Sequence, residues 1–212
     1  MRSLEETLLL VPGFVIGFAL HEFAHALAAD KLGDPTPRQQ GRLTIEPWPH
    51  IDIFGFITLL IAGFGWAKPV QIDPRNFKNP RRDDIIVSLA GPLTNFILAL
   101  TFGFTIFILY HLNVFGLVSD HTGQIIVGIL VNAININLIL FFFNLLPLPP
   151  LDGSHVVASM LPREQAYKYM SLQLYGMLFI LFLAYFTKTL RYIVFEPADQ
   201  ITKMILRLFG LS

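Results

Sequence analysis

Cysteine is absent from this sequence of 212 residues. Disulfides and cysteine-based metal sites are therefore excluded, and any bound metal must be held by His, Asp, Glu or Asn side chains. A chain without thiols also carries no sign of the redox compartment in which it folds.

Charged residues are scarce as well. They make up 14% of the chain, against about 25% in soluble domains, and 54% of the residues are hydrophobic. Acidic and basic residues balance to a formal net charge of zero, which points neither to nucleic acid nor to a polybasic membrane patch. Several apolar stretches are long enough to cross a bilayer, which indicates a polytopic membrane protein rather than a globular enzyme.

The predicted fold class is an all-α polytopic membrane protein, a bundle of about four to six transmembrane helices. The spans are expected at residues 8–29, 85–110, 125–146 and, as a shorter run, 172–186. Residues 197–211 are apolar at helical spacing and are expected to form an amphipathic tail on the membrane or on the bundle. We find no internal repeat, so residues 1–212 are predicted to be a single membrane-embedded domain with a core over residues 8–155.

The loop region between the first two spans is less regular. Residues 51–67 are apolar but interrupted by glycines and flanked on both sides by basic residues, which favours a re-entrant segment over a complete span. Residues 41–46 alternate apolar and polar side chains, which predicts a short edge strand. The distribution of Lys and Arg places the N-terminus and residues 111–123 outside, and residues 31–84 and 147–170 on the cytoplasmic side.

The first apolar stretch contains the motif His-Glu-x-x-His at residues 21–25. On a helix, His21 and His25 are one turn apart, so both imidazoles emerge on one face, as two zinc ligands from a single helix must. Glu22 lies beside the first ligand, where it can reach a bound water without being a ligand itself. Chance occurrence, a solvated helix face and a signal peptide are the alternatives, but the helix has no solvated face and Glu5 and Glu6 precede it.

A catalytic zinc keeps three protein ligands and one open position. Asp152 is the best placed third ligand, because apart from Glu22 no other carboxylate lies within an apolar segment. Zinc lowers the pKa of its water toward about 7, and Glu22 would act as general base and return the proton to the leaving amine. The sequence therefore predicts one Zn²⁺ per chain on His21, His25 and Asp152.

These motifs together resemble the site-2 protease family of intramembrane zinc metalloproteases. The resemblance is carried by His21-Glu22-x-x-His25, by Gly91-Pro92-x-x-Asn95, and by the run from Asn144 through Pro147 and Pro149 to Asp152-Gly153. It implies zinc on the two histidines and Asp152, with Glu22 as the base. It also implies that Asn144 holds the substrate or polarises its carbonyl, and that Asn95 is structural or supports a ligand.

The sequence around Trp48 and Trp66 is similar to the compact branch of that family, without PDZ or CBS domains. The partners expected are then a lipid bilayer and a protein substrate with a transmembrane segment, which the strand at 41–46 could capture by β-addition. His50 is a candidate proton donor or oxyanion contact, or else a loop histidine packed on Trp48. His155 is a candidate supporting residue beside Asp152. A prokaryotic cell membrane with a cytoplasmic-side active site is expected, and the alternative function is a non-proteolytic membrane zinc-binding or transport protein.

Overall fold

The structure is a computed structural model that describes residues 4–62 and 65–211, and in them the chain is helical. Three helices are long and apolar enough to cross a membrane: α1 (Leu4–Leu32), α4 (Pro80–His111) and α5 (Asp120–Asn144). A fourth span is available if α7 (Arg163–Met170) and α8 (Gln173–Phe186), which meet at a bend of 55°, are one broken span. The described residues thus hold three to four spans, at or below the lower end of the predicted number.

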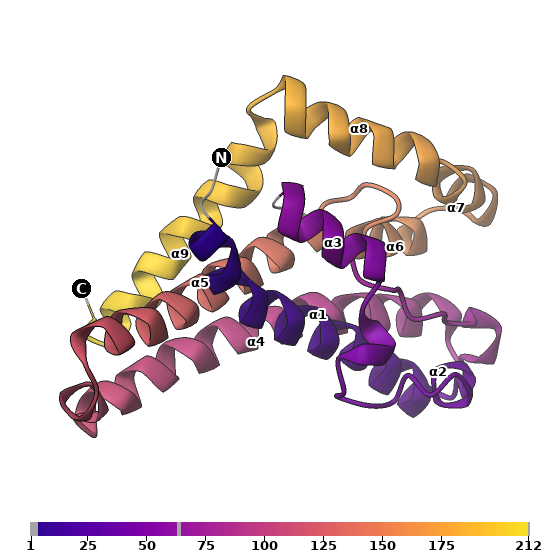
Figure 1. The fold of residues 1–212 in the computed structure, drawn as a ribbon. Helices are drawn as coiled ribbons and strands as arrows, with labels where there is room; N and C mark the ends of the chain where they lie inside the picture. The colour runs from indigo at the N-terminus through magenta and orange to yellow at the C-terminus, as the bar shows by residue number, and fades with distance from the viewer. Residues whose placement is uncertain (1–3, 63–64, 212) are drawn as a thin grey trace.

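Shorter elements connect these spans (Figure 1). The remaining α-helices are α2 (Thr36–Gln39), α3 (Ile53–Ala62), α6 (Asp152–Met160) and α9 (Glu196–Leu208). Single turns of 3₁₀ helix lie at Trp48–His50, Pro74–Asn76 and Val114–Leu117, and a π-helical turn at Arg191–Phe195 leads into α9.

Local sequence explains where the long helices begin and end. α1 ends before Gly33, whose φ of 109° suits a residue without a side chain, as the sequence predicted. α4 starts at Pro80. Proline has no N–H, and at the first position of a helix an N–H would have no partner within the helix, so nothing is lost there. Ser119 caps α5 by accepting a hydrogen bond from the Thr122 N–H, and α5 ends three residues before Pro147.

The three long helices pack on one another, and α9 packs on α4 and α5 (Figure 1). Buried side chains from α4, α5 and α9 make the main apolar core: Ala99, Ile106, Ile134, Leu138, Ala198 and Ile205. The tail expected at residues 197–211 therefore forms a helix that packs on the bundle through Ala198 and Ile205, while Met204 and Leu208 stay exposed.

Glycines on α1 let α5 approach its backbone closely. A Cβ at Gly13 would lie 2.6 Å from the Cα of Ala133, and one at Gly17 would lie 2.9 Å from Oδ1 of Asn137. Small residues at a four-residue spacing serve such close helix contacts in membranes. The contact between α1 and α5 therefore depends on having no side chain at these two positions.

The predicted edge strand at residues 41–46 is wrong, because these residues form a turn and coil in the structure. Gly41 adopts a positive φ of 67°, which breaks an extended run, and the Arg42 side chain turns inward and is buried. The β-type pairing in the described chain is instead an isolated antiparallel bridge between Ile51 and Ala67.

That bridge joins the chain just before α3 to the chain that follows it. α3 has 10 residues and is about 15 Å long, half the thickness of a hydrocarbon core. The backbone N–H of Lys68 donates to the carbonyl of His50, so the segment leaves beside the point where it entered. Residues 63 and 64 lie outside the described residues, and re-entry into the membrane stays a prediction.

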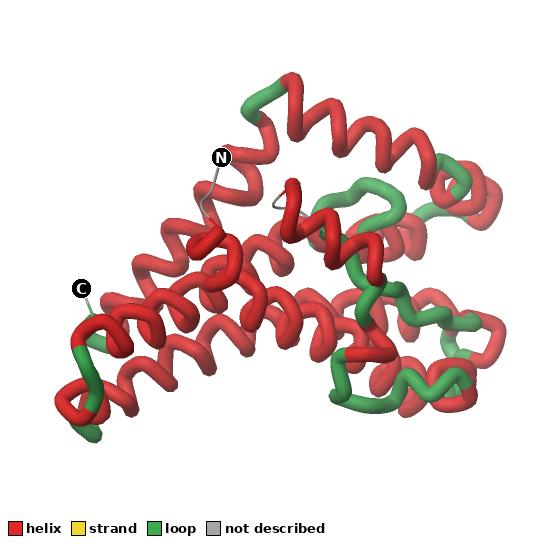
Figure 2. The backbone as a smooth tube through the Cα atoms, in the orientation of Figure 1, coloured by secondary structure: helices red, strands yellow, loops and turns green. Residues whose placement is uncertain are grey.

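The longer loops gather at one end of the bundle (Figure 2). The chain before α3, the chain before α4 and the turn after α5 meet there, while the connection from α4 to α5 lies at the opposite end. The C-terminal part of α1 runs to the loop-rich end, and α6 begins near it (Figure 1). This arrangement brings residues from distant parts of the sequence to the second half of α1.

Candidate metal centre

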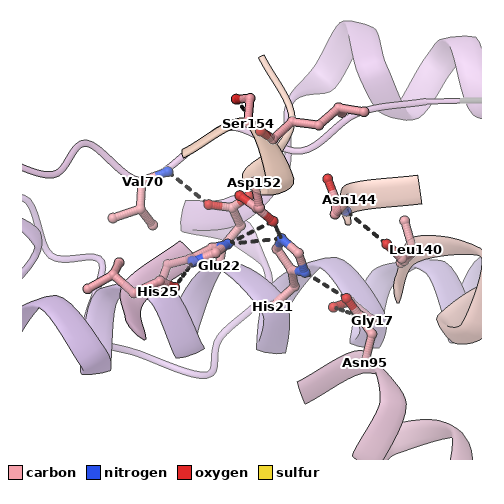
Figure 3. A network of polar contacts seen from close by, with 12 residues as sticks. Gly17, His21, Glu22, His25, Val70, Asn95, Leu140, Asn144, Asp152 and Ser154 are labelled. Atoms are coloured by element: carbon pink, nitrogen blue, oxygen red, sulfur yellow. Dashed lines mark hydrogen bonds and ion pairs between the residues drawn. The ribbon is translucent and has the colours of Figure 1, made fainter. Parts of the chain in front are cut away.

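Two histidines of α1 and one aspartate of α6 lie together inside the protein (Figure 3). His21 and His25 are buried, with 4% and 6% of their surface exposed. Asp152 is the first residue of α6, which the chain reaches after turning back from the end of α5. Gly153 makes that turn possible, because a Cβ there would collide with the backbone carbonyl of Leu145 and lie 2.7 Å from the carbonyl oxygen of Leu146.

The three side chains present one atom each to a common point. Nε2 of His21 and Nε2 of His25 are 3.0 Å apart, and they lie 3.2 Å and 3.4 Å from Oδ2 of Asp152. Tetrahedral zinc with ligand bonds of about 2.0–2.1 Å holds its ligand atoms about 3.3 Å apart. The three separations are therefore of the size that one zinc ion requires.

The opposite nitrogen of each imidazole is already committed. Nδ1 of His21 lies 2.6 Å from Oδ1 of Asn95, and Nδ1 of His25 lies 2.7 Å from the carbonyl oxygen of Val87. An oxygen acceptor at each Nδ1 requires the hydrogen to be there, so each neutral ring has a lone pair on Nε2. Oδ2 of Asp152 is buried and receives no hydrogen bond within the described chain. Three electron-rich atoms thus face one another without hydrogens between them, which calls for a cation.

Gly91 of α4 makes room for both rings. A Cβ at this position would overlap Nε2 of His25 and lie 2.7 Å from Nε2 of His21. Small residues such as Gly91 let another helix approach closely, and here it is the histidine face of α1 that approaches α4.

Glu22 lies beside this group and is also buried. Its Oε2 accepts a hydrogen bond of 2.8 Å from the backbone N–H of Val70 and lies 3.9 Å from Nη2 of Arg42 (Figure 3 shows the first contact). Arg42 in turn donates to the carbonyls of Lys68 and Pro69, at 2.5 Å and 3.3 Å. The chain segment 68–70 is thereby fixed against the carboxylate of Glu22.

A cavity of about 260 Å³ opens on this group. Glu22, His25 and Asp152 line it, together with His155 and Asp84, whose side chains form an ion pair of 3.4 Å from Nδ1 to Oδ2. The side chain of His155 is 40% exposed. His155, which the sequence suggested only as a supporting residue near Asp152, therefore shares the cavity with Glu22 and Asp152.

Of the other predicted residues, one contacts the His-His-Asp group and two do not. Asn95 contacts His21 directly. Asn144, on the last turn of α5, donates to the Leu140 carbonyl, a bond within its own helix (Figure 3). His50 is fully buried, with Nδ1 3.3 Å from Nη2 of Arg42 and Nε2 2.8 Å from the Thr44 carbonyl. Both ring nitrogens are used within the loop, and burial lowers the pKa of His50 from its usual value, which favours the neutral ring.

Several contributors to this site could not be identified from the sequence. The Val70 N–H and the Val87 carbonyl are backbone groups, which carry no sequence signal. Asp84 was one charge among many in a polar loop. Asn137, whose Oδ1 accepts a hydrogen bond from Nδ2 of Asn95, is one of several amides in α5, and its place beside the histidine face depends on how the helices pack.

The fold and the site define a helical membrane protein with a buried His-His-Asp group next to the carboxylate of Glu22. The profile of Peptidase family M50 matches residues 112–184, which include Asn144 and Asp152. A Bacillus subtilis (strain 168) protein named "Putative zinc metalloprotease YwhC" is 41% identical over 208 residues, covering 95% of this chain and 90% of that protein. The chain therefore belongs to peptidase family M50, the site-2 protease family.

More distant relatives carry the same kind of name. A "Putative zinc metalloprotease" of Methanocaldococcus jannaschii is 31% identical over 142 residues, 66% of this chain and 64% of the relative. "Putative zinc metalloprotease Rip2" of Mycobacterium tuberculosis (strain H37Rv) is 30% identical over 152 residues, 68% of this chain and 54% of the relative. No solved structure matches at a significant level.

Proposed function

We propose that this protein is an intramembrane zinc metalloprotease in which His21, His25 and Asp152 hold one zinc ion and Glu22 is the general base. Family membership and the names of the relatives support the metalloprotease activity. The observation that carries the assignment of residues is the convergence of one ligand atom from each of the three side chains within 4.8 Å of one another.

The donor set suits zinc. Two neutral imidazoles and one carboxylate form a three-ligand set of the kind that catalytic zinc sites use, with the fourth position left for water or substrate. Both imidazoles carry the outer hydrogen bond that fixes their tautomer. A zinc ion bound by such a set would supply a Lewis acid that lowers the pKa of its bound water to about 7.

Glu22 has the position that a general base needs. It is adjacent in sequence to His21 but is turned toward Val70 and the cavity. In the proposed reaction it takes the proton of the attacking water and delivers it to the amine of the departing chain. The hydrogen bond from Val70 keeps one carboxylate oxygen in place, so the other remains available for this transfer.

The substrate we propose is a protein segment in or beside the bilayer, and the site faces the cytoplasmic side. His25 lies seven residues before the end of α1, which is about 10 Å along a helix. The charged loop that follows α3 forms one wall of the cavity through Pro69, Val70 and Pro74. Water and cleaved product would therefore pass between the site and the loop-rich end of the bundle.

The test measures zinc content together with cleavage of a transmembrane reporter by purified protein. Glu22→Gln should keep one zinc per chain and lose cleavage, because the amide cannot take a proton, whereas Asp152→Ala should lose both. Full cleavage by Glu22→Gln, or by protein freed of metal, would overturn the proposal. A non-proteolytic zinc protein would instead show no reporter cleavage in the wild type and unchanged zinc handling in Glu22→Gln.

A further inference from the structure

One face of α1 carries a ladder of polar groups that leads to the metal centre. The carbonyls of Gly13 and Gly17 and the imidazole of His21 follow one another at intervals of four residues, one helical turn each. Two amide side chains from the neighbouring helices, Asn137 of α5 and Asn95 of α4, are hydrogen-bonded along this face, and both are completely buried. Gly17 matters here because a Cβ at this position would lie 2.9 Å from Oδ1 of Asn137.

The contacts of Asn137 determine which way its amide points. Its Nδ2 donates to the carbonyl of Ala133 at 2.9 Å and to that of Gly13 at 3.5 Å. Two carbonyl acceptors on one side of the amide require the NH₂ group there. Its Oδ1 must therefore face the other way, toward Asn95.

The orientation of Asn95 is set by Asn137 together with the Gly17 carbonyl, and with Asn137 removed only one of these two acceptors remains. Nδ2 of Asn95 donates to Oδ1 of Asn137 at 2.9 Å and to the Gly17 carbonyl at 3.1 Å, so both of its hydrogens are used. Its Oδ1 is then turned to Nδ1 of His21, 2.6 Å away. If Asn95 were flipped, its NH₂ group would face Nδ1 of His21 and favour the tautomer with the hydrogen on Nε2. In that tautomer Nε2 has no lone pair with which to bind a metal.

We propose that Asn137 is a positioning residue for the metal centre, which acts through Asn95 to hold His21 in the metal-binding tautomer. This inference rests on the proposed function, because the orientation of His21 matters only if its Nε2 binds zinc. Asn137 touches neither the three converging atoms nor the cavity. Its effect on the site is transmitted entirely by the direction of the Asn95 amide.

A purely structural role makes a different prediction. If the two asparagines only join helices, each substitution would weaken the bundle separately and their effects would add. If they act as one relay, removing Asn95 removes the path by which Asn137 acts, so removing both costs no more zinc affinity than removing Asn95. Asn132 is a matched control, because it is on the same helix and, among the residues that the structure describes, its amide bonds only to the Gly128 carbonyl one turn back.

The experiment measures the zinc dissociation constant of detergent-purified protein by competition with a chelator. Asn95→Leu should weaken zinc binding by about 10–100-fold, the usual cost of losing such an outer partner. Asn137→Leu should weaken it by about tenfold or more, the double variant no more than Asn95→Leu, and Asn132→Leu should match the wild type. Zinc affinity of Asn137→Leu equal to that of Asn132→Leu, or effects of the two changes that multiply, would overturn the proposal.

A rescue separates orientation from stability. A carboxylic acid at position 95 accepts the His21 N–H with one oxygen and donates its O–H to the Gly17 carbonyl with the other, so it needs no amide at position 137 to orient it. Asn95→Asp combined with Asn137→Leu should therefore bind zinc more tightly than Asn137→Leu alone, although it carries one more change. A merely structural loss at position 137 would not be repaired in this way.

The ring nitrogens of His21 report the relay without any metal. In metal-free wild type, the ¹⁵N shifts should show hydrogen on Nδ1, and in Asn137→Leu they should show a mixture of tautomers. If the wild type binds no zinc, the proposed function fails, while these shifts still decide the relay. A single Nδ1–H tautomer in Asn137→Leu contradicts it, whatever the zinc affinity.

Discussion

The backbone N–H of Val70 donates a hydrogen bond of 2.8 Å to Oε2 of Glu22, across 48 positions of sequence. The proposed general base is thus held by a loop and not by its own helix. Arg42, which is 5% exposed, binds the carbonyls of the two residues before Val70 and so sets the position of that N–H. The loop, the arginine and the carboxylate form one unit, and it should be possible to disturb the base without disturbing the metal.

Arg42→Met should lower the turnover of the protease while leaving its zinc in place. The methionine fills the buried space but cannot hold the carbonyls of Lys68 and Pro69, so the Val70 N–H no longer fixes Glu22. We expect kcat to fall by about tenfold, or about 1.4 kcal/mol in the barrier. Arg75→Met is the control, because Arg75 is 89% exposed and pairs only with Asp73 in the same loop. Equal kcat values in the two variants would contradict this role of Arg42.

Gly91→Ala should destroy the metal centre. Its new methyl group would occupy the space of Nε2 of His25 and press on His21, and both buried rings are tethered at Nδ1 by Asn95 and the Val87 carbonyl. We expect zinc affinity to fall by at least 100-fold, because ligand atoms must be held within a few tenths of an ångström. Gly128→Ala is the matched control in α5, where the added Cβ would lie 3.5 Å from Leu9 in ordinary contact. If Gly91→Ala and the control bind the same amount of zinc, α4 packs less tightly against the two rings than the structure shows.

The sequence predicts the long helices well because a bilayer constrains them so strongly. Every spanning segment must be apolar and must satisfy its backbone internally, so composition and length alone locate α1, α4 and α5. The predicted ends differ from the observed ones by several residues, because charged first turns such as residues 80–84 extend the helix beyond its apolar part. Chain segments outside the bilayer escape this constraint, and there the strand predicted at residues 41–46 failed.

The candidate site is predictable to the extent that rare residues reveal it. His21 and His25 are related by helix geometry alone, and Asp152 stands out as a carboxylate in an apolar context. The groups around them are held by packing: the Val87 carbonyl, the Val70 N–H and the orientation of Asn137. Their positions depend on how the helices meet, and a sequence pattern records residue types but not the approach of two backbones.

Asn144→Ala should reduce cleavage with little effect on zinc. Asn144 lies on the last turn of α5, half-buried, and its amide now bonds only to the Leu140 carbonyl within the helix. A substrate could recruit this amide as a donor to the carbonyl under attack, and loss of such a donor costs about 10²–10³ in kcat. Asn132→Ala removes the same kind of bond, from a side-chain amide to a backbone carbonyl one turn earlier in α5, and should keep full activity. An equal loss of cleavage in both variants would assign Asn144 to helix stability.

Asp34 should make the loop that holds Glu22 sensitive to acid. It is completely buried and accepts hydrogen bonds from Thr36, Asp73 and Asn76, so it joins the chain after α1 to the chain before α4. Burial alone would raise the pKa of Asp34, but these hydrogen bonds outweigh it and place the pKa below 3.8. The folded pKa is depressed, so the stabilisation is complete above pH 3.8 and is lost as the pH falls toward the folded value.

Hydrogen exchange of residues 68–79, measured from pH 6 to pH 3 and corrected for intrinsic rates, tests this dependence. Protection in the wild type should decline below about pH 4, and in Asp34→Asn it should already be low at pH 6, because the amide cannot accept all of these bonds. Asp73, whose pKa is lowered to about 2 by Arg75, titrates in the same direction. The decisive quantity is therefore the difference between wild type and variant, which should shrink as the pH falls. A difference that stays constant from pH 6 to pH 3 would show that Asp34 holds the loop by its shape and not by its charge.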